Sequence, residues 1–117
     1  MIPELGIEVY IETAVFADNI HKSFTEYLFK TTDVYGKISI RPRKIGDVIK
    51  LRGTNCIKTL KKLFTEKRIP LVKRATVPII ADEKGVLGVY GVGSDARAAP
   101  AIGDTIYIIK FKEIQQK

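Results

Sequence analysis

Nucleophilic catalysis by a thiol is the first chemistry that the residue types allow, because the sequence holds one cysteine, Cys56, and one histidine, His21. A thiol nucleophile needs a general base beside it, and these two residues are far apart in the sequence. Cys56 lies at the start of a predicted helix, a position that favours a reactive thiolate. A free cysteine is more often a small buried residue, so we interpret Cys56 as a core-edge side chain and expect no catalytic residue.

Metal binding and phosphate binding through a glycine-rich loop are not predicted either. The acidic residues are scattered, and no Cys, His, Asp or Glu set has the spacing of a metal site. Segment 88–93, Gly-Val-Tyr-Gly-Val-Gly, superficially resembles a phosphate-binding loop. Such a loop leads from a strand into a helix, but residues 94–100 lack apolar helical periodicity. We therefore interpret these glycines as part of a curved hairpin.

Positive charge is concentrated in one third of the chain. Residues 37–74 hold thirteen Lys and Arg against two acids, Asp47 and Glu66, whereas the rest of the chain holds seven against eleven. This segregation creates a local positive field that attracts polyanions such as nucleic acids. A basic surface kept only for solubility is the alternative.

The spacing of these cations indicates a surface that can contact phosphate groups. Lysines at helical spacing share one face of the predicted helix, and alternating arginines on a predicted strand offer bidentate phosphate contacts. Aromatic residues are scarce here, which favours recognition of duplex or folded RNA over single strands. An ordinary solvated helix face remains the alternative. The candidate RNA-binding residues are Arg41, Arg43, Lys58, Lys61, Lys62, Lys67, Arg68, Lys73 and Arg74.

Several strands are expected to support this surface, because apolar and polar residues alternate along short segments. Residues 23–30 favour a strand over a helical turn, residues 17–22 a loop, and residues 93–101 a second loop. Pro42 places its strand at a sheet edge or ends it, and the strand at 104–112 is apolar on both faces, as central strands are. The other strands are predicted at residues 5–12, 37–43, 48–52, 77–81 and 86–92, with a tight turn at 82–85.

One main helix is predicted over residues 56–67. Its apolar stripe comprises Ile57, Leu60 and Phe64, with Leu63 at the margin. Residues 53–55 supply candidate N-caps, Ile69-Pro70 stops the helix, and 71–75 suits one further helical turn. We expect a single α+β domain over residues 1–117, a small β-rich fold with a strongly bent sheet or a partly closed barrel.

A cytosolic location is expected by default. No apolar run approaches the ~20 residues of a membrane helix, and the first residues lack the pattern of a signal peptide. A lone cysteine cannot form an internal disulfide, so nothing indicates an oxidising compartment.

Two motifs in the basic region resemble the C-terminal domain of tRNA(Ile)-lysidine synthetases. Residues 40–47, Ile-Arg-Pro-Arg-Lys-Ile-Gly-Asp, match its "R-x-R-x-x-G-D" entry. Residues 60–64, Leu-Lys-Lys-Leu-Phe, followed by Ile69-Pro70, Arg74 and Pro78, match its "L-K-K-L-F…I-P…R…P" signature. Asp82 and Gly85 fit the next hairpin, and Arg97 a basic position after it. The chain departs from the pattern at Gly88, where many members carry tryptophan or another bulky residue.

This resemblance implies a non-catalytic part of a larger enzyme. The family's full-length enzymes use ATP and Mg²⁺ to adenylate the wobble cytidine of an isoleucine tRNA with a CAU anticodon, and free lysine then displaces AMP to give lysidine. The ATP site is an N-terminal "S-G-G-x-D-S" loop, which this sequence lacks. We therefore expect no cofactor in this chain, and as partners the tRNA and an N-terminal ATP-binding catalytic domain.

The resemblance also ranks the candidate residues. It covers residues 37–112 as the family-like core, whereas residues 1–36 match only loosely. It implies that the domain holds tRNA near the acceptor stem, and that a related fold occurs in the β subunit of phenylalanyl-tRNA synthetase. A protein-interaction domain that positions the catalytic neighbour with little RNA contact is the competing hypothesis. By resemblance the first phosphate-contact candidates are Arg41, Arg43, Lys61, Lys62 and Arg74, the second Lys58, Lys67, Arg68 and Lys73, and the structural residues Leu60, Phe64, Pro70 and Pro78.

Overall fold

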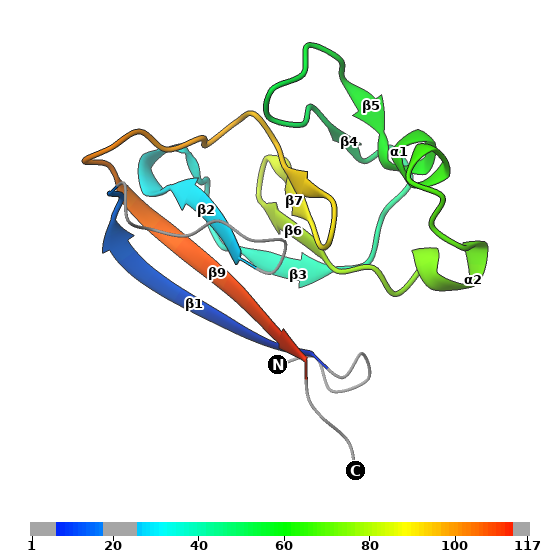
Figure 1. Cartoon of the computed structure of the whole chain (residues 1–117), viewed down its shortest axis with the longest axis horizontal. Helices are drawn as coiled ribbons and strands as arrows, with labels where there is room; N and C mark the ends of the chain where they lie inside the picture. Colours follow the sequence, from blue (N-terminus) through cyan, green and yellow to red (C-terminus); the bar gives the residue numbers. More distant parts are fainter. Residues whose placement is uncertain (1–6, 18–25, 114–117) are drawn as a thin grey trace.

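Two long strands pair along their whole length to build the first sheet. The computed structural model describes residues 7–17 and 26–113. In it β1 (Ile7–Val15) and β2 (Glu26–Lys30) flank β9 (Thr105–Glu113), and both pair with it antiparallel (Figure 1). The strand predicted over 104–112 is thus central, as its two apolar faces indicated, and its Ile106 and Ile109 are fully buried.

A second antiparallel sheet crosses the middle of the molecule. Its order is β3 (Ser39–Arg41), β6 (Ile79–Asp82), β7 (Gly85–Val89) and β8 (Gly93–Ser94). β3 lies at the edge and ends immediately before Pro42, which confirms the position inferred from that proline. β7, the turn after it and β8 contain the glycines of segment 88–93, so the hairpin interpretation of that segment is confirmed.

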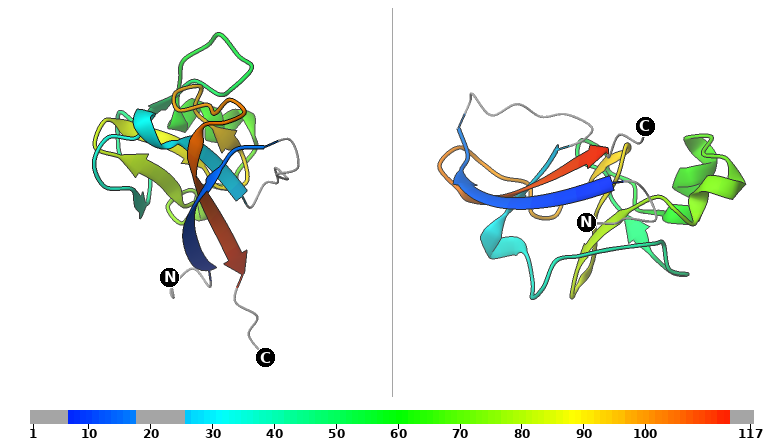
Figure 2. Two further views of the ribbon diagram at one scale, coloured as in Figure 1. Left: turned by 90° about the vertical axis from the view of Figure 1, so that its left-hand side faces the viewer. Right: turned by 90° about the horizontal axis from the view of Figure 1, so that it is seen from below.

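A short strand pair and two helices lie on the side of the molecule away from β1 (Figures 1 and 2). β4 (Val48–Ile49) pairs with β5 (Lys58–Thr59), which leads directly into α1 (Leu60–Glu66). α2 (Leu71–Arg74) is the predicted further helical turn, and a 3₁₀ turn (Thr31–Asp33) follows β2.

The second sheet is the middle layer, because consecutive residues of β6 and β7 face opposite cores. Ile80 and Leu87 pack with Phe29 and other residues of the first sheet. Their neighbours Ile79 and Val86 pack instead against the side of α1 and β4. That second core holds Ile49, Leu60, Leu63, Phe64 and Val89, all almost fully buried. A strand buried on both faces needs apolar residues at successive positions, as Pro78 to Ala81 provide.

The helix predicted over 56–67 is wrong at its start. Residues 58–59 pair with 48–49 as β5, so this non-local pairing prevents the chain from turning helical before Leu60. The N-cap is Thr59, whose Oγ1 accepts a hydrogen bond from the Lys62 backbone N–H at 3.2 Å, and not a residue of 53–55. Ile57 therefore precedes the helix and is 71% exposed rather than part of its apolar stripe.

Other expectations are confirmed only in part. The strand predicted over 5–12 spans 7–15, the one over 48–52 is regular only at 48–49, and the one over 86–92 ends at 89. The strand expected over 23–30 is present at 26–30, and most of the loop expected over 17–22 lies outside the described residues. Among those residues the three sheets are separate and open, so a small β-rich domain with one main helix is confirmed but a partly closed barrel is not.

Candidate nucleic-acid interface

The nine predicted RNA-binding residues come from adjoining segments on the α1 side of the molecule. Residues 42–47 lead from the end of β3 past α1 into β4, and α2 follows α1 closely (Figures 1 and 2). The Arg43 guanidinium carbon lies 5.9 Å from the centre of the Phe64 ring, which is a cation–π contact between this segment and α1. The fold therefore brings the arginine strand end and the lysine helix together.

Most of these cations have no acidic partner. The exposed members are Lys61 and Lys62 on α1, Lys67 and Arg68 after it, and Lys73 on α2. Within residues 7–17 and 26–113, no ion pair joins any of the five to a carboxylate. Their charges are consequently free to attract an external polyanion.

The side chains of three predicted residues donate hydrogen bonds within the molecule. Arg41 donates to both carboxylate oxygens of Asp47, at 2.8 and 3.1 Å. Lys58 lies on β5 rather than on the lysine face of the helix, and its Nζ is 2.7 Å from Glu66 Oε2. Arg74 donates to the carbonyl of Ile69 at 2.9 Å and so ties α2 to the end of α1. Only the Arg41 and Lys58 charges are balanced by these contacts.

The two acidic residues of the basic region, Asp47 and Glu66, are each paired with a basic residue. Burial acts to raise the pKa of Asp47, but hydrogen bonds from the Arg41 side chain and the Lys44 backbone outweigh it and lower that pKa. The hydrogen bond from Lys58 lowers the pKa of Glu66, whose side chain is 40% exposed. Both carboxylates therefore remain charged near neutral pH, and each neutralises one cation rather than the whole surface.

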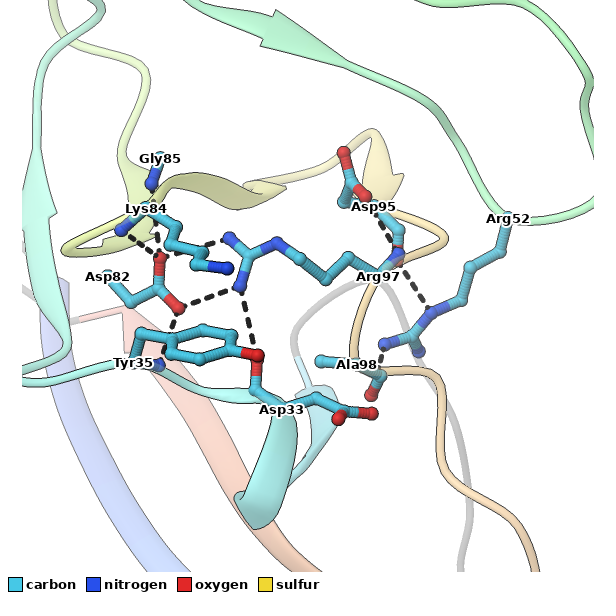
Figure 3. A network of polar contacts seen from close by, with 9 residues as sticks. All are labelled: Asp33, Tyr35, Arg52, Asp82, Lys84, Gly85, Asp95, Arg97 and Ala98. Carbon is cyan, nitrogen blue, oxygen red and sulfur yellow. Dashed lines mark hydrogen bonds and ion pairs between the residues drawn. The ribbon is translucent and has the colours of Figure 1, made fainter.

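Two arginines serve the fold and not the surface (Figure 3). Arg52 Nη2 donates to the carbonyls of Leu28 at 2.8 Å and Ala98 at 3.2 Å. Its Nε donates to the backbone carbonyl of Asp95 at 3.0 Å. Burial lowers the pKa of this guanidinium, which lies 5.4 Å from the Phe29 ring centre. The sequence around Arg52 does not indicate that its side chain points inward, because all its partners are distant along the chain.

Arg97 is the second of these arginines, and it holds Asp82 beside Asp33 and Tyr35 (Figure 3).

Lys44, which was not among the predicted residues, is exposed next to Arg43. Its position directly after the predicted Arg43 was the signal available for it.

A shallow apolar groove lies between β4–β5 and residues 95–97. It has a volume of about 400 Å³ and is lined by Val48, Lys50, Ile57 and Arg97, among others. Val48 and Ile57 are 46% and 71% exposed. Apolar exposure of this kind suits contact with another protein surface more than contact with phosphates.

Cys56 and His21 are the two residues considered for nucleophilic chemistry. Cys56 is exposed, so its interpretation as a core-edge side chain is wrong, because residues 53–57 form a surface loop before β5. His21 lies outside the described residues.

No cluster of three potential metal ligands occurs in the described part of the chain. No helix there is long and apolar enough to cross a membrane.

Sequence comparisons find a family model and several relatives that match this chain. The family model of the TilS substrate C-terminal domain matches residues 38–108. The tRNA(Ile)-lysidine synthase of Bacillus subtilis strain 168 is 46% identical over 48 residues, which are 41% of this chain and 10% of that protein. The one from Geobacillus kaustophilus strain HTA426 is 37% identical over 73 residues, 62% of this chain and 16% of that protein. The chain thus spans only a small part of the length of these relatives.

Solved structures share the fold over nearly the whole chain. A crystal structure of a TILS C-terminal domain matches with a TM-score of 0.81 and 24% identity, covering 96% of this chain and 88% of that one. An N-terminal fragment of the phenylalanyl-tRNA synthetase β-subunit from Pyrococcus horikoshii matches with a TM-score of 0.58 and 14% identity, covering 93% and 30%. At these identities the likeness concerns the fold alone.

Proposed function

Because this chain belongs to the family of TilS substrate C-terminal domains, we propose that it is the tRNA-binding accessory domain of a tRNA(Ile)-lysidine synthase. The parent enzyme would use ATP, Mg²⁺ and free lysine to convert the wobble cytidine of an isoleucine tRNA with a CAU anticodon to lysidine. An N-terminal ATP-binding domain would perform that chemistry in the cytosol. The domain described here would hold the tRNA on its acceptor-stem side.

The observation that carries this proposal is the set of exposed cations without acidic partners on α1, α2 and the turn between them. Lys61 and Lys62 lie on a helix anchored by the buried Leu60, Leu63 and Phe64. Charges held on a rigid element bind a phosphate backbone at a smaller entropic cost than charges on a mobile loop. Phe64, the one aromatic residue within 58–74, is fully buried, which supports recognition of a folded RNA backbone.

Salt dependence of tRNA binding tests this function. The 117-residue chain should bind an isoleucine tRNA transcript with an affinity that falls steeply as salt is added. With ~4–6 phosphate contacts, a plot of log affinity against log salt concentration should have a slope of about −3 to −5. Binding without salt dependence, or no binding at low salt, would contradict the proposal.

A pair of matched variants locates the surface. Lys61→Gln combined with Lys62→Gln should weaken binding by about fivefold or more and reduce the salt slope by about 1 to 2. The control is Lys110→Gln combined with Lys112→Gln, which removes the same charge from β9 in the other sheet. Equal losses in both double variants would mean that only net charge matters. A loss of helicity together with binding would make the two lysines structural.

A second candidate function is that of a protein-interaction domain that positions a catalytic neighbour. It is favoured by the apolar groove, where Val48 and Ile57 are exposed. Under this hypothesis a full-length enzyme that lacks the domain keeps its tRNA affinity and loses catalytic efficiency instead. Reduced tRNA affinity of the shortened enzyme would favour the tRNA-binding function.

A further inference from the structure

Asp47 makes hydrogen bonds to several segments of the basic region. Its carboxylate accepts two hydrogen bonds from the Arg41 guanidinium, at 2.8 and 3.1 Å, and one from the Lys44 backbone N–H at 2.8 Å. The Arg41 and Asp47 side chains are only 18% and 12% exposed. Such a planar two-pronged pair fixes the orientation of both side chains.

The backbone of Asp47 extends this arrangement to the lysine helix. Its carbonyl accepts a hydrogen bond at 3.0 Å from the N–H of Leu60, the first residue of α1. The amino-terminal N–H groups of a helix have no partner within the helix. The Asp47 carbonyl accepts from the first of these groups, the N–H of Leu60, and Thr59 Oγ1 accepts from the N–H of Lys62 at 3.2 Å. The start of α1 is therefore held by the same residue that holds the end of β3.

The segment between these anchor points carries two of the free cations. The N–H of Asp47 donates to the Lys44 carbonyl at 3.1 Å, which closes a turn. Arg43 immediately precedes this turn and contacts the Phe64 ring. The Asp47 contacts to Lys44 and Leu60 thus help to fix the place of Arg43 and Lys44 relative to Lys61 and Lys62.

We propose that Asp47 is the positioning residue of the RNA-binding surface, and that Arg41 is its internal clamp rather than a phosphate contact. This inference rests on the proposed function. It assigns different roles to the two acids of the basic region, because Glu66 makes a single exposed ion pair with Lys58. Electrostatics alone requires that removal of either acid strengthens binding of a polyanion. Positioning by Asp47 requires the opposite result for that residue.

The test compares Asp47→Asn with Glu66→Gln in the 117-residue chain, by affinity for isoleucine tRNA at several salt concentrations. Each variant loses one negative charge, so its net charge rises by one. Glu66→Gln should bind equally or more tightly, whereas Asp47→Asn should bind about three- to tenfold more weakly, the loss of one or two hydrogen bonds. Amide hydrogen exchange at Lys44 and Leu60 should speed up in Asp47→Asn and stay unchanged in Glu66→Gln.

Asp47→Asn binding as tightly as the original chain, or more tightly, would overturn the inference and leave the proposed function standing. An original chain that binds no tRNA would overturn the proposed function and this inference with it. If Asp47→Asn fails to fold, Arg41→Lys tests the same contact, because it keeps the charge and loses the planar fork. Arg41→Lys should then bind more weakly, and unchanged binding by that variant would overturn the inference.

Discussion

Arg97 and Asp82 form a two-pronged ion pair in which Nη1 lies 2.8 Å from Oδ2 and Nη2 lies 3.0 Å from Oδ1 (Figure 3). The Asp82 side chain is fully buried, whereas that of Arg97 is 27% exposed. The same carboxylate accepts the backbone N–H groups of Tyr35, Lys84 and Gly85. It therefore joins the β6–β7 turn, the segment before β3 and the loop after β8.

Replacement of Asp82 by alanine should destabilise the domain strongly. The change leaves the Arg97 guanidinium and three backbone N–H groups without their acceptor, and breaking such a pair costs about 3 kcal/mol or more. Urea unfolding followed by circular dichroism measures the loss. Glu83→Gln, at the exposed neighbouring position, should change stability by less than about 0.5 kcal/mol. Similar losses in both variants would refute the role given to Asp82.

The domain should lose stability in acid through the same carboxylates. Burial acts to raise the pKa of Asp82, but hydrogen bonds from Arg97 and the backbone outweigh it and lower that pKa, and Asp47 behaves alike. A group whose folded pKa is lowered stabilises the fold above its unfolded pKa of about 4 and loses this contribution as the pH falls through the folded value. Urea midpoints from about pH 6 to about pH 2.5 should therefore decline most below about pH 4. Asp82→Asn should flatten this decline, and an unchanged acid profile would exclude Asp82 as its source.

Gly88 should not tolerate a larger side chain in this protein. A Cβ there would lie 3.3 Å from the Gly93 carbonyl oxygen and 3.4 Å from Cζ of Phe29. Phe29 is fully buried and already fills the space. Gly88→Val should thus cost about 1–3 kcal/mol of overpacking, measured by thermal unfolding. Ser39→Val, at an exposed strand position, is the control, and a stabilised Gly88→Val would show that Phe29 can move aside.

Much of this fold was predictable because its strands have strong local patterns. Residues 104–112 were predicted to be apolar on both faces, and the strand at 105–113 is central in its sheet. Pro42 lacks an N–H for a ladder, and β3 ends before it at an edge. Leu60 and Phe64 follow helical spacing and are fully buried. In each case the residues themselves carry the information.

The features that were missed depend on partners distant in sequence. Thr59 rather than an earlier residue caps the helix because Lys58 and Thr59 pair with Ile49 and Val48, a contact outside the local sequence. Arg52 is directed inward by the carbonyls of Leu28, Asp95 and Ala98, which only the folded chain brings together. The same holds for the candidate site, where composition revealed the cations and only the contacts distinguish Arg41 from its free neighbours.

Arg68 has a backbone conformation that glycine adopts at less cost. Its φ is +56°, and it follows α1 at the position where helices most often end with glycine. The Arg68 N–H donates to the Thr65 carbonyl at 3.1 Å, and the Ile69 N–H donates to the Phe64 carbonyl at 3.0 Å. These two bonds close the helix in a Schellman motif. An arginine there costs about 1 kcal/mol relative to glycine.

Arg68→Gly should therefore raise the melting temperature while it weakens tRNA binding. We expect a gain of about 0.5–1 kcal/mol in stability and a reduction of about 0.9 in the salt slope if Arg68 makes one phosphate contact. Lys67→Gly is the matched variant, because it removes the same charge one residue earlier, where φ is −83°. That variant should lose stability, since glycine gains nothing at a negative φ and costs chain entropy. Thermal unfolding and tRNA titration of the two variants separate the conformational role of Arg68 from its charge. A lower melting temperature for Arg68→Gly would contradict the strain argument, and an unchanged salt slope would remove Arg68 from the RNA-binding surface.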